Sequence, residues 1–170
     1  MGRAGIEVML AAVEAAYRGD RFHSLLQNLE DVSDEEWGTR PAGYSSEVFG
    51  DQPELSIADL VRHVGGAKLM WTNHSFGDRT LTWGEVRPPS EDRGAVMGWL
   101  NDAHAGFAAA VAALEDDAEL AVDRMAHWGR PLRTQAIVSI VINHDLYHSG
   151  EINRQRALIR GAEGFEAPST

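Results

Sequence analysis

The chain has 170 residues, 44% of them hydrophobic, so it is about the size of one domain (residues 1–170) and has enough apolar side chains for a core. Its 15 basic and 26 acidic residues give a formal charge of −11, which repels phosphates and anionic lipids and argues against nucleic-acid and membrane partners. Cysteine is absent, which excludes disulfides, thiolate ligands and a cysteine nucleophile and leaves His, Asp and Glu as the strong metal ligands.

The first predicted helix covers residues 6–32, where apolar side chains recur at helical spacing. Gly19 predicts a kink within it. Ser33 is followed three residues later by Glu36, the pattern of a capping box, in which each side chain binds a free backbone N–H group at a helix start. A short helical turn is therefore predicted around Trp37.

A second helix is predicted to begin at Ser56, because Ser56 and Asp59 repeat the capping pattern, and to end near Gly77. Its apolar stripe includes His63. The stretches 38–55 and 77–89 are the longest without a helical pattern, and residues 80–86 are the place where a short strand is predicted.

A third helix is predicted from Ser90, after two prolines that block an earlier start, to about Leu114. A turn at residues 129–131 precedes a long fourth helix, which carries His144 and His148 on one face and ends at Gly161. Four long amphipathic helices without convincing strands predict an all-α fold, a four-helix bundle.

The sequence contains no apolar run of the length that a membrane-spanning helix needs, about 18 residues or more. The N-terminus also lacks a basic segment followed by an apolar stretch and a small-residue cleavage site. We therefore expect a cytoplasmic protein.

Three histidines are predicted to share one metal site. His144 and His148 are four residues apart, so their rings lie on one helix face and can reach a single ion, although such pairs also arise by chance. His63 lies in an apolar stripe, where an unpaired polar ring would cost roughly 1–3 kcal/mol. Together they predict an open triad for a divalent ion, with an exchangeable position for chemistry. The alternative for His63 is a core histidine that hydrogen-bonds a carbonyl or carboxylate.

Four charged residues on the fourth helix are candidates for further roles. Glu151 follows His148 by three residues, so it can orient a water molecule or act as a catalytic base, or it is an ordinary surface acid. Arg154, with Arg156, is the candidate for binding a cofactor or substrate carboxylate, and the alternative is a basic last turn that complements the helix dipole. Asp145 is predicted to face a neighbouring helix or solvent, with a hydrogen bond to a ligand histidine as the alternative.

The other histidines fit the site less well. His74 lies eleven residues beyond the ligand of the second helix, or about 16 Å at 1.5 Å per residue, and cannot reach the same ion. His104 is a weak candidate and is predicted to be polar filler. His23 and His127 receive no role, because solvated histidines are ordinary in bends and loops. Trp83 is the tryptophan predicted to be exposed.

Two segments carry recognisable motifs: SIADLVRHVGGAKLMW and NHDLYHSGEINRQRALIRG. The first contains Ser-hydrophobic-x-x-Leu-x-x-His, from Ser56 to His63. The second contains His-x-x-x-His-x-Gly, at His144, His148 and Gly150. With these motifs the chain resembles the DinB-like superfamily, also called the DinB/YfiT type, of metal-binding bundles, and the resemblance covers most of its length.

The resemblance implies an up-down-down-up bundle, a homodimer, and zinc, nickel or another divalent ion on His63, His144 and His148. Related activities are thiol S-transferases that use bacillithiol or mycothiol, and mycothiol-dependent maleylpyruvate isomerases. After the last ligand this chain has Ser-Gly-Glu in place of the family's common Arg-Gly-Gln, which affects inferred substrate contacts but not the ligands.

The expected function is accordingly a metal-dependent transferase that activates a low-molecular-weight thiol and acts on a small-molecule substrate. One alternative is a metal-dependent hydrolase in which Glu151 or Asp145 shuttles protons. The other is a non-catalytic metal-binding or ligand-binding protein of the stress response, which a closed four-ligand coordination sphere would favour.

Overall fold

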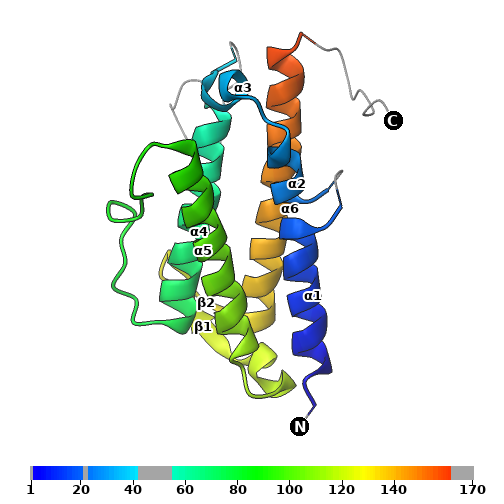
Figure 1. Ribbon diagram of the computed structural model, residues 1–170. Helices are drawn as coiled ribbons and strands as arrows, with labels where there is room; N and C mark the ends of the chain where they lie inside the picture. The colour runs from blue at the N-terminus through cyan, green and yellow to red at the C-terminus, as the bar shows by residue number, and fades with distance from the viewer. Residues whose placement is uncertain (1, 21–22, 42–54, 162–170) are drawn as a thin grey trace.

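The computed structural model describes residues 2–20, 23–41 and 55–161, and within them four long helices form the body of the protein (Figure 1). The long helices are α1 (Ala4–Arg18), α4 (Ile57–Phe76), α5 (Arg93–Ala112) and α6 (Thr134–Ile159). The shorter elements are α2 (Leu25–Glu30), α3 (Asp34–Gly38), the 3-10 helix η2 (Asp117–Ala121) and the strands β1 (Asp123–Met125) and β2 (Pro131–Arg133). The predicted all-α fold is confirmed. No helix in these ranges is long and apolar enough to cross a membrane.

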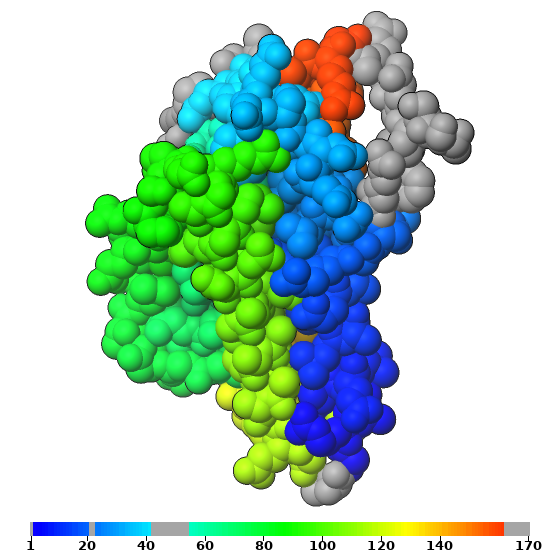
Figure 2. Space-filling view, viewed as in Figure 1, coloured from blue at the N-terminus to red at the C-terminus, as the bar shows by residue number. Residues whose placement is uncertain are grey.

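The first and last of the four long helices run in one direction, and the middle two run in the opposite direction. Arg3, at the start of α1, donates a hydrogen bond of 2.8 Å to the carbonyl of Ala112 at the end of α5, so these two helices are antiparallel. Gln155, late in α6, donates a hydrogen bond of 3.0 Å to the carbonyl of Leu55 just before α4, so α4 and α6 are also antiparallel. In chain order the four helices run up, down, down and up (Figure 1). On one face of the protein the side chains of α1 and α5 meet along the bundle (Figure 2).

The first helix is shorter than its sequence pattern predicts. The expected continuous helix over residues 6–32 is wrong, because α1 ends at Arg18 and α2 begins again at Leu25. The break follows from Gly19, where an added Cβ atom would lie 2.2 Å from the carbonyl oxygen of Ala15. Only glycine fits at this helix end, so its effect is a stop rather than a kink.

Capping side chains set most of the predicted helix starts. The capping boxes of Ser33 with Glu36, at α3, and of Ser56 with Asp59, at α4, are both present. The start of α5 differs from the prediction, because its cap is Asp92, whose carboxylate accepts a hydrogen bond of 3.0 Å from the N–H group of Ala95.

The two strands lie elsewhere than predicted. Residues 80–86 contain no strand; instead the N–H and hydroxyl groups of Thr82 donate to the carboxylate of Glu85, which closes a turn. β1 and β2 form an antiparallel hairpin on either side of the turn predicted at residues 129–131. Because each strand has only three residues, period-two alternation is too short to be recognised in the sequence.

Two adjoining apolar clusters make up the core. One contains Leu60 of α4 and Ile152 of α6. The other contains Ala67 of α4 and Val141 of α6. The histidines of both helices lie in the sequence positions between these residues, so the fold places them where the two clusters adjoin, together with further buried polar side chains. We call this set the polar layer; its members are Tyr17, His63, Lys68, His104, His144, Asp145 and His148.

Candidate metal centre

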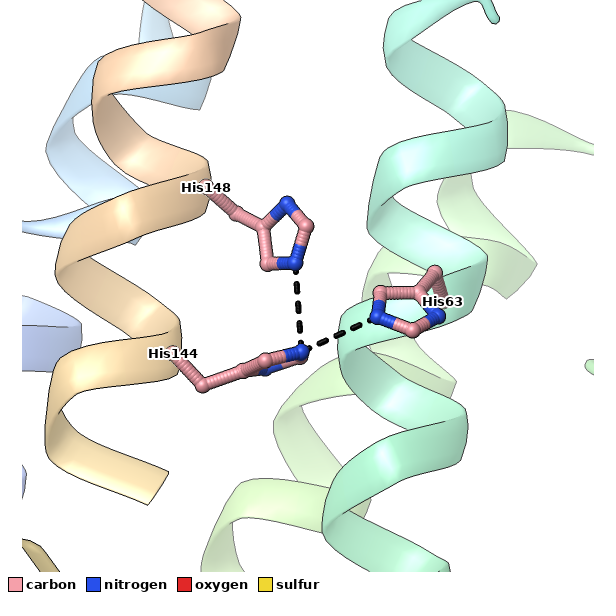
Figure 3. A group of neighbouring side chains, drawn as sticks. All are labelled: His63, His144 and His148. Carbon is pink, nitrogen blue, oxygen red and sulfur yellow. Dashed lines mark hydrogen bonds between the residues drawn. The ribbon is translucent and has the colours of Figure 1, made fainter. Parts of the chain in front are cut away.

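The three predicted histidines meet between α4 and α6 (Figure 3). The Nε2 atom of His144 lies 2.9 Å from Nε2 of His63 and 3.1 Å from Nε2 of His148. One nitrogen of each ring lies within 4.8 Å of the others. His63 and His144 are half-buried and His148 is buried, so the cluster lies at the edge of the core and reaches solvent.

The cluster could hold a divalent metal ion. Metal–nitrogen bonds are about 2.0–2.1 Å long, so two imidazole nitrogens on one ion lie roughly 3 Å or somewhat more apart, as the His144 contacts do. Hydrogen bonding satisfies the arrangement less well, because Nε2 of His144 can donate one proton or accept one and cannot bond His63 and His148 at once. A cation satisfies all three lone pairs.

Burial keeps the rings of His63 and His144 neutral. Burial, and after it the charge of the neighbouring His148, lowers the pKa of His63 to about 4 and that of His144 to about 2. A neutral imidazole has a lone pair to give to a metal, whereas an imidazolium has none. At pH 7 these two rings are therefore available as ligands.

Glu151 orients the third ring. Its Oε2 atom lies 2.6 Å from Nδ1 of His148, so Nδ1 carries the proton and Nε2 presents its lone pair to the cluster. The hydroxyl of Tyr147 donates a hydrogen bond of 3.3 Å to the other oxygen of Glu151. The carboxylate thus lies on the far side of the His148 ring, where it positions a ligand. Its predicted role as a catalytic base stays a prediction.

We expect Glu151→Gln to weaken metal binding by about 10–100-fold, the usual cost of removing a carboxylate that orients a ligand histidine. The amide cannot stabilise the Nδ1–H tautomer as a carboxylate does. Competition with a chromogenic chelator measures the affinity, and Glu7→Gln, at an exposed position of α1, is the control. An affinity equal to that of the wild type would contradict the orienting role.

Asp145 faces α4 rather than a ligand histidine. Its Oδ2 atom lies 2.6 Å from Nζ of Lys68, and both side chains are 1% exposed. Burial raises the pKa of Asp145 and lowers that of Lys68, while the opposite charge of each partner counteracts both shifts. The buried ion pair therefore neutralises two charges in the polar layer.

The two arginines of α6 that are candidates for ligand binding lie away from the three-histidine cluster. Arg154 is exposed and follows His148 by six residues, which places it about 240° around α6. Its predicted contact with a cofactor stays a prediction. Arg156 ties α6 to α3, because it forms an ion pair of 3.3 Å with Glu36. His74 lies beyond the site, as expected, and its Nε2 atom is 2.8 Å from the carbonyl of a loop residue.

His104 is a buried member of the polar layer without a place in the cluster. Its Nε2 atom contacts the carboxylate of Glu14 at 3.0 Å, and its ring stacks on Tyr17 with centroids 3.7 Å apart. Its Nδ1 atom has no hydrogen-bond partner within the described residues. The prediction that His104 is polar filler agrees with this position.

The buried His104 makes stability depend on pH. Burial and the charge of Lys68 lower the pKa of His104 to about 4, although Glu14 opposes the shift. An unfolded histidine titrates near ~6.5, so between these values the unfolded chain binds more protons, and the free energy of unfolding decreases as the pH falls. The expected loss is about 3 kcal/mol from pH 6.5 to pH 4.

Urea unfolding of the wild type and of His104→Phe across this range isolates the contribution of His104, because the other histidines titrate in both proteins. The unfolding free energy of the wild type minus that of the variant should decrease as the pH falls, because only the wild type takes up a proton at His104 on unfolding. A difference that does not change with pH would show that His104 titrates alike in the folded and unfolded states.

His127, for which no role is predicted from the sequence, lies close to the cluster. Its ring packs edge-to-face against Trp83 and Trp128, with centroids 5.6 Å and 4.8 Å away. Its charge, when present, would lower the pKa of both His63 and His144. The prediction that Trp83 is exposed is confirmed, since it is 46% exposed. No local motif marks His127, because its position depends on the β1–β2 hairpin.

A family model described as the DinB superfamily matches residues 17–152. The matched segment runs from the end of α1 to late α6 and contains all three clustered histidines. No curated protein was found to match the chain.

Proposed function

Because the chain belongs to the DinB superfamily, we propose that His63, His144 and His148 bind a divalent metal ion and that the protein is a metal-dependent transferase for low-molecular-weight thiols. The observation that carries the proposal is the convergence of three imidazole nitrogens, one of them on a ring oriented by Glu151. Imidazole ligands suit both zinc and nickel, which we propose as the resident ions.

A bound divalent ion supplies Lewis acidity, which lowers the pKa of a thiol that approaches it and favours the thiolate at neutral pH. The residues of the chain itself hold the ion and leave one side of it accessible. His63 and His144 reach solvent, so an outside molecule can approach their side of the cluster. The thiol has to come from outside, since the sequence contains no cysteine.

The proposed reaction is a substitution. The thiolate sulfur gives its electron pair to an electrophilic carbon and forms a C–S bond. The bond between that carbon and its leaving group breaks, and the leaving group takes the bonding pair. The proton of the thiol passes to solvent, so charge and atoms balance without an oxidant or reductant.

Metal analysis tests the site first. The protein is expressed without a histidine tag, and elemental mass spectrometry measures metal per chain in the wild type and in a His63→Ala, His144→Ala double variant. We expect about one ion per chain in the wild type and little in the variant. Wild-type protein that binds neither zinc nor nickel after reconstitution would contradict the proposal.

Thiol binding tests the activity. In cobalt-substituted protein, a thiolate ligand gives a charge-transfer band, which titration with 2-mercaptoethanol should produce in the wild type and not in the double variant. Transfer of the thiol to 1-chloro-2,4-dinitrobenzene is then followed by absorbance. Ester hydrolysis without thiol transfer would favour the hydrolase, and metal binding without an effect of thiol would favour a non-catalytic binding protein.

We also propose that the protein forms a homodimer through α6. Leu146 is 40% exposed on this helix, and four residues later Gly150 has open space where a side chain would lie. Residues four apart share a helix face, so a second helix can approach closely there. Light scattering should give the mass of two chains, and Leu146→Glu should lower it. The cytoplasmic location stays a prediction.

A further inference from the structure

Three aromatic side chains lie beside the candidate metal centre and are not among its three clustered histidines. Trp83 comes from the segment between α4 and α5, and His127 and Trp128 come from the turn of the β1–β2 hairpin. We call these three the aromatic rim. Trp83 is 46% exposed and Trp128 51%, although both are large apolar side chains. Clustered exposed apolar side chains next to a reactive centre indicate a binding surface.

The rim adjoins both the cluster and the core. The rings of Trp83 and His63 are parallel within 4°, with centroids 6.1 Å apart. Beneath the rim, the buried Trp71 contacts His127 and Trp128 edge-to-face at 5.0 Å and 4.9 Å. The exposed rings therefore rest on a packed indole and present their remaining surface beside the histidines.

The last turns of α4 hold the two segments of the rim in place. The N–H group of Leu81, two residues before Trp83, donates a hydrogen bond of 3.0 Å to Oδ1 of Asn73. The hydroxyl of Ser75 donates one of 3.0 Å to the carbonyl of Met125 in the hairpin. Because these bonds fix the backbone, the rim loses little conformational freedom when it binds a ligand.

Gly66 makes the approach of Trp83 to α4 possible. An added Cβ atom there would lie 3.1 Å from Cζ3 of Trp83 and 3.0 Å from Cγ1 of Val86. A side chain at this position would push the indole away from the helix that carries His63. The small residue thus keeps an aromatic surface within reach of the cluster.

Charge selects the kind of ligand. Within the described residues, cation–π contacts involve Tyr17, Trp37 and Phe76, and no rim ring is covered by a basic side chain. The two positive charges of an ion on the triad would repel a cationic ligand. For an anionic group the rim offers the His127 ring, whose pKa burial lowers, and the indole N–H groups of its two tryptophans, none of which carries a fixed positive charge.

We propose that the aromatic rim binds a planar, uncharged apolar group of the molecule that reacts at the three-histidine cluster. The site would then select aromatic over aliphatic thiols. The inference rests on the proposed function, because the cluster supplies the second point of attachment. Aromatic pairing adds to the affinity that the burial of apolar area provides, and we expect a preference of about tenfold.

Calorimetric titration of the metal-saturated protein with benzyl mercaptan and with 1-propanethiol tests the rim. The wild type should bind benzyl mercaptan about tenfold more tightly, Trp83→Ala should remove most of the preference, and Trp83→Phe should retain it. Val122→Ala, an exposed apolar residue outside the rim, is the control and should behave as the wild type. Equal affinities for the two thiols in the wild type, or an undiminished preference in Trp83→Ala, would overturn the proposal.

Two further measurements separate the possible failures. Metal per chain is determined for every sample: wild-type protein without metal contradicts the metal site, whereas loaded protein without an aromatic preference contradicts the rim alone. Benzyltrimethylammonium serves as a cationic probe with the same ring. Tighter binding of this cation than of benzyl mercaptan would show that the rim recognises positive charge and would also overturn the proposal.

Discussion

Replacing His148 by alanine is expected to lower the metal affinity by more than about 100-fold, because the loss of an orienting carboxylate alone costs 10–100-fold and this change removes a ligand. The proposed ligand atom of His148 belongs to a ring that is 2% exposed and held by Glu151. Because the ring is buried and fixed in this way, we expect no other side chain to take its place in the variant. Helical content should stay nearly unchanged, since the apolar clusters on both sides of the polar layer remain intact. Elemental analysis after dialysis and circular dichroism measure the two effects.

His23→Ala is the matched control, because the His23 side chain is 75% exposed and lies far along the chain from the cluster. It should keep the wild-type metal content. Metal stoichiometry that is unchanged in His148→Ala would contradict the ligand assignment. A large loss of helix would instead show that the histidines contribute to the bundle itself.

The site could be predicted from sequence where helix geometry alone determines it. His144 and His148 share a face because α-helical spacing brings residues four apart together, and no tertiary information is needed. His63 could be predicted because a polar ring in an apolar stripe requires a partner. Helical spacing also predicts that Glu151 neighbours His148, but its orientation toward Nδ1 of His148 depends on rotamers that spacing does not specify.

The remaining features depend on contacts between distant segments. Lys68 meets Asp145 across 77 positions of sequence, and nothing local to either residue marks the pair. His127 reaches the site through a hairpin whose strands are too short for periodicity to show. The helix stops at Gly19 because the backbone there leaves no room for a Cβ atom beside the carbonyl oxygen of Ala15. A glycine inside a continuous helix has the same sequence pattern, so the pattern does not distinguish a stop from a kink.

Lys68→Met is expected to destabilise the fold by about 3–5 kcal/mol, because it leaves the carboxylate of Asp145 buried without its counter-charge. Oδ1 of Asp145 already has no hydrogen-bond partner within the described residues, so the ion pair to Nζ is the interaction that compensates its burial. The midpoint of thermal unfolding should fall by roughly 10 °C, given about 2–4 °C per kcal/mol for chains of this size. Urea unfolding and calorimetry measure the loss. Asp123→Ala, which breaks the exposed pair with Arg133, is the control and should cost no more than about 1 kcal/mol.

The double variant Lys68→Met, Asp145→Leu distinguishes two reasons for keeping a buried ion pair. Desolvating two charges costs nearly as much as their attraction returns, so an apolar pair of similar volume should recover most of the stability lost in the single variant. If it does, the pair contributes little net stability, and its effect on metal affinity, measured by chelator competition, becomes the informative quantity.

Lys68 carries a positive charge that disfavours a protonated His144. An apolar replacement should therefore raise the pH below which the metal is released, and an unchanged release profile would show that the pair serves packing alone.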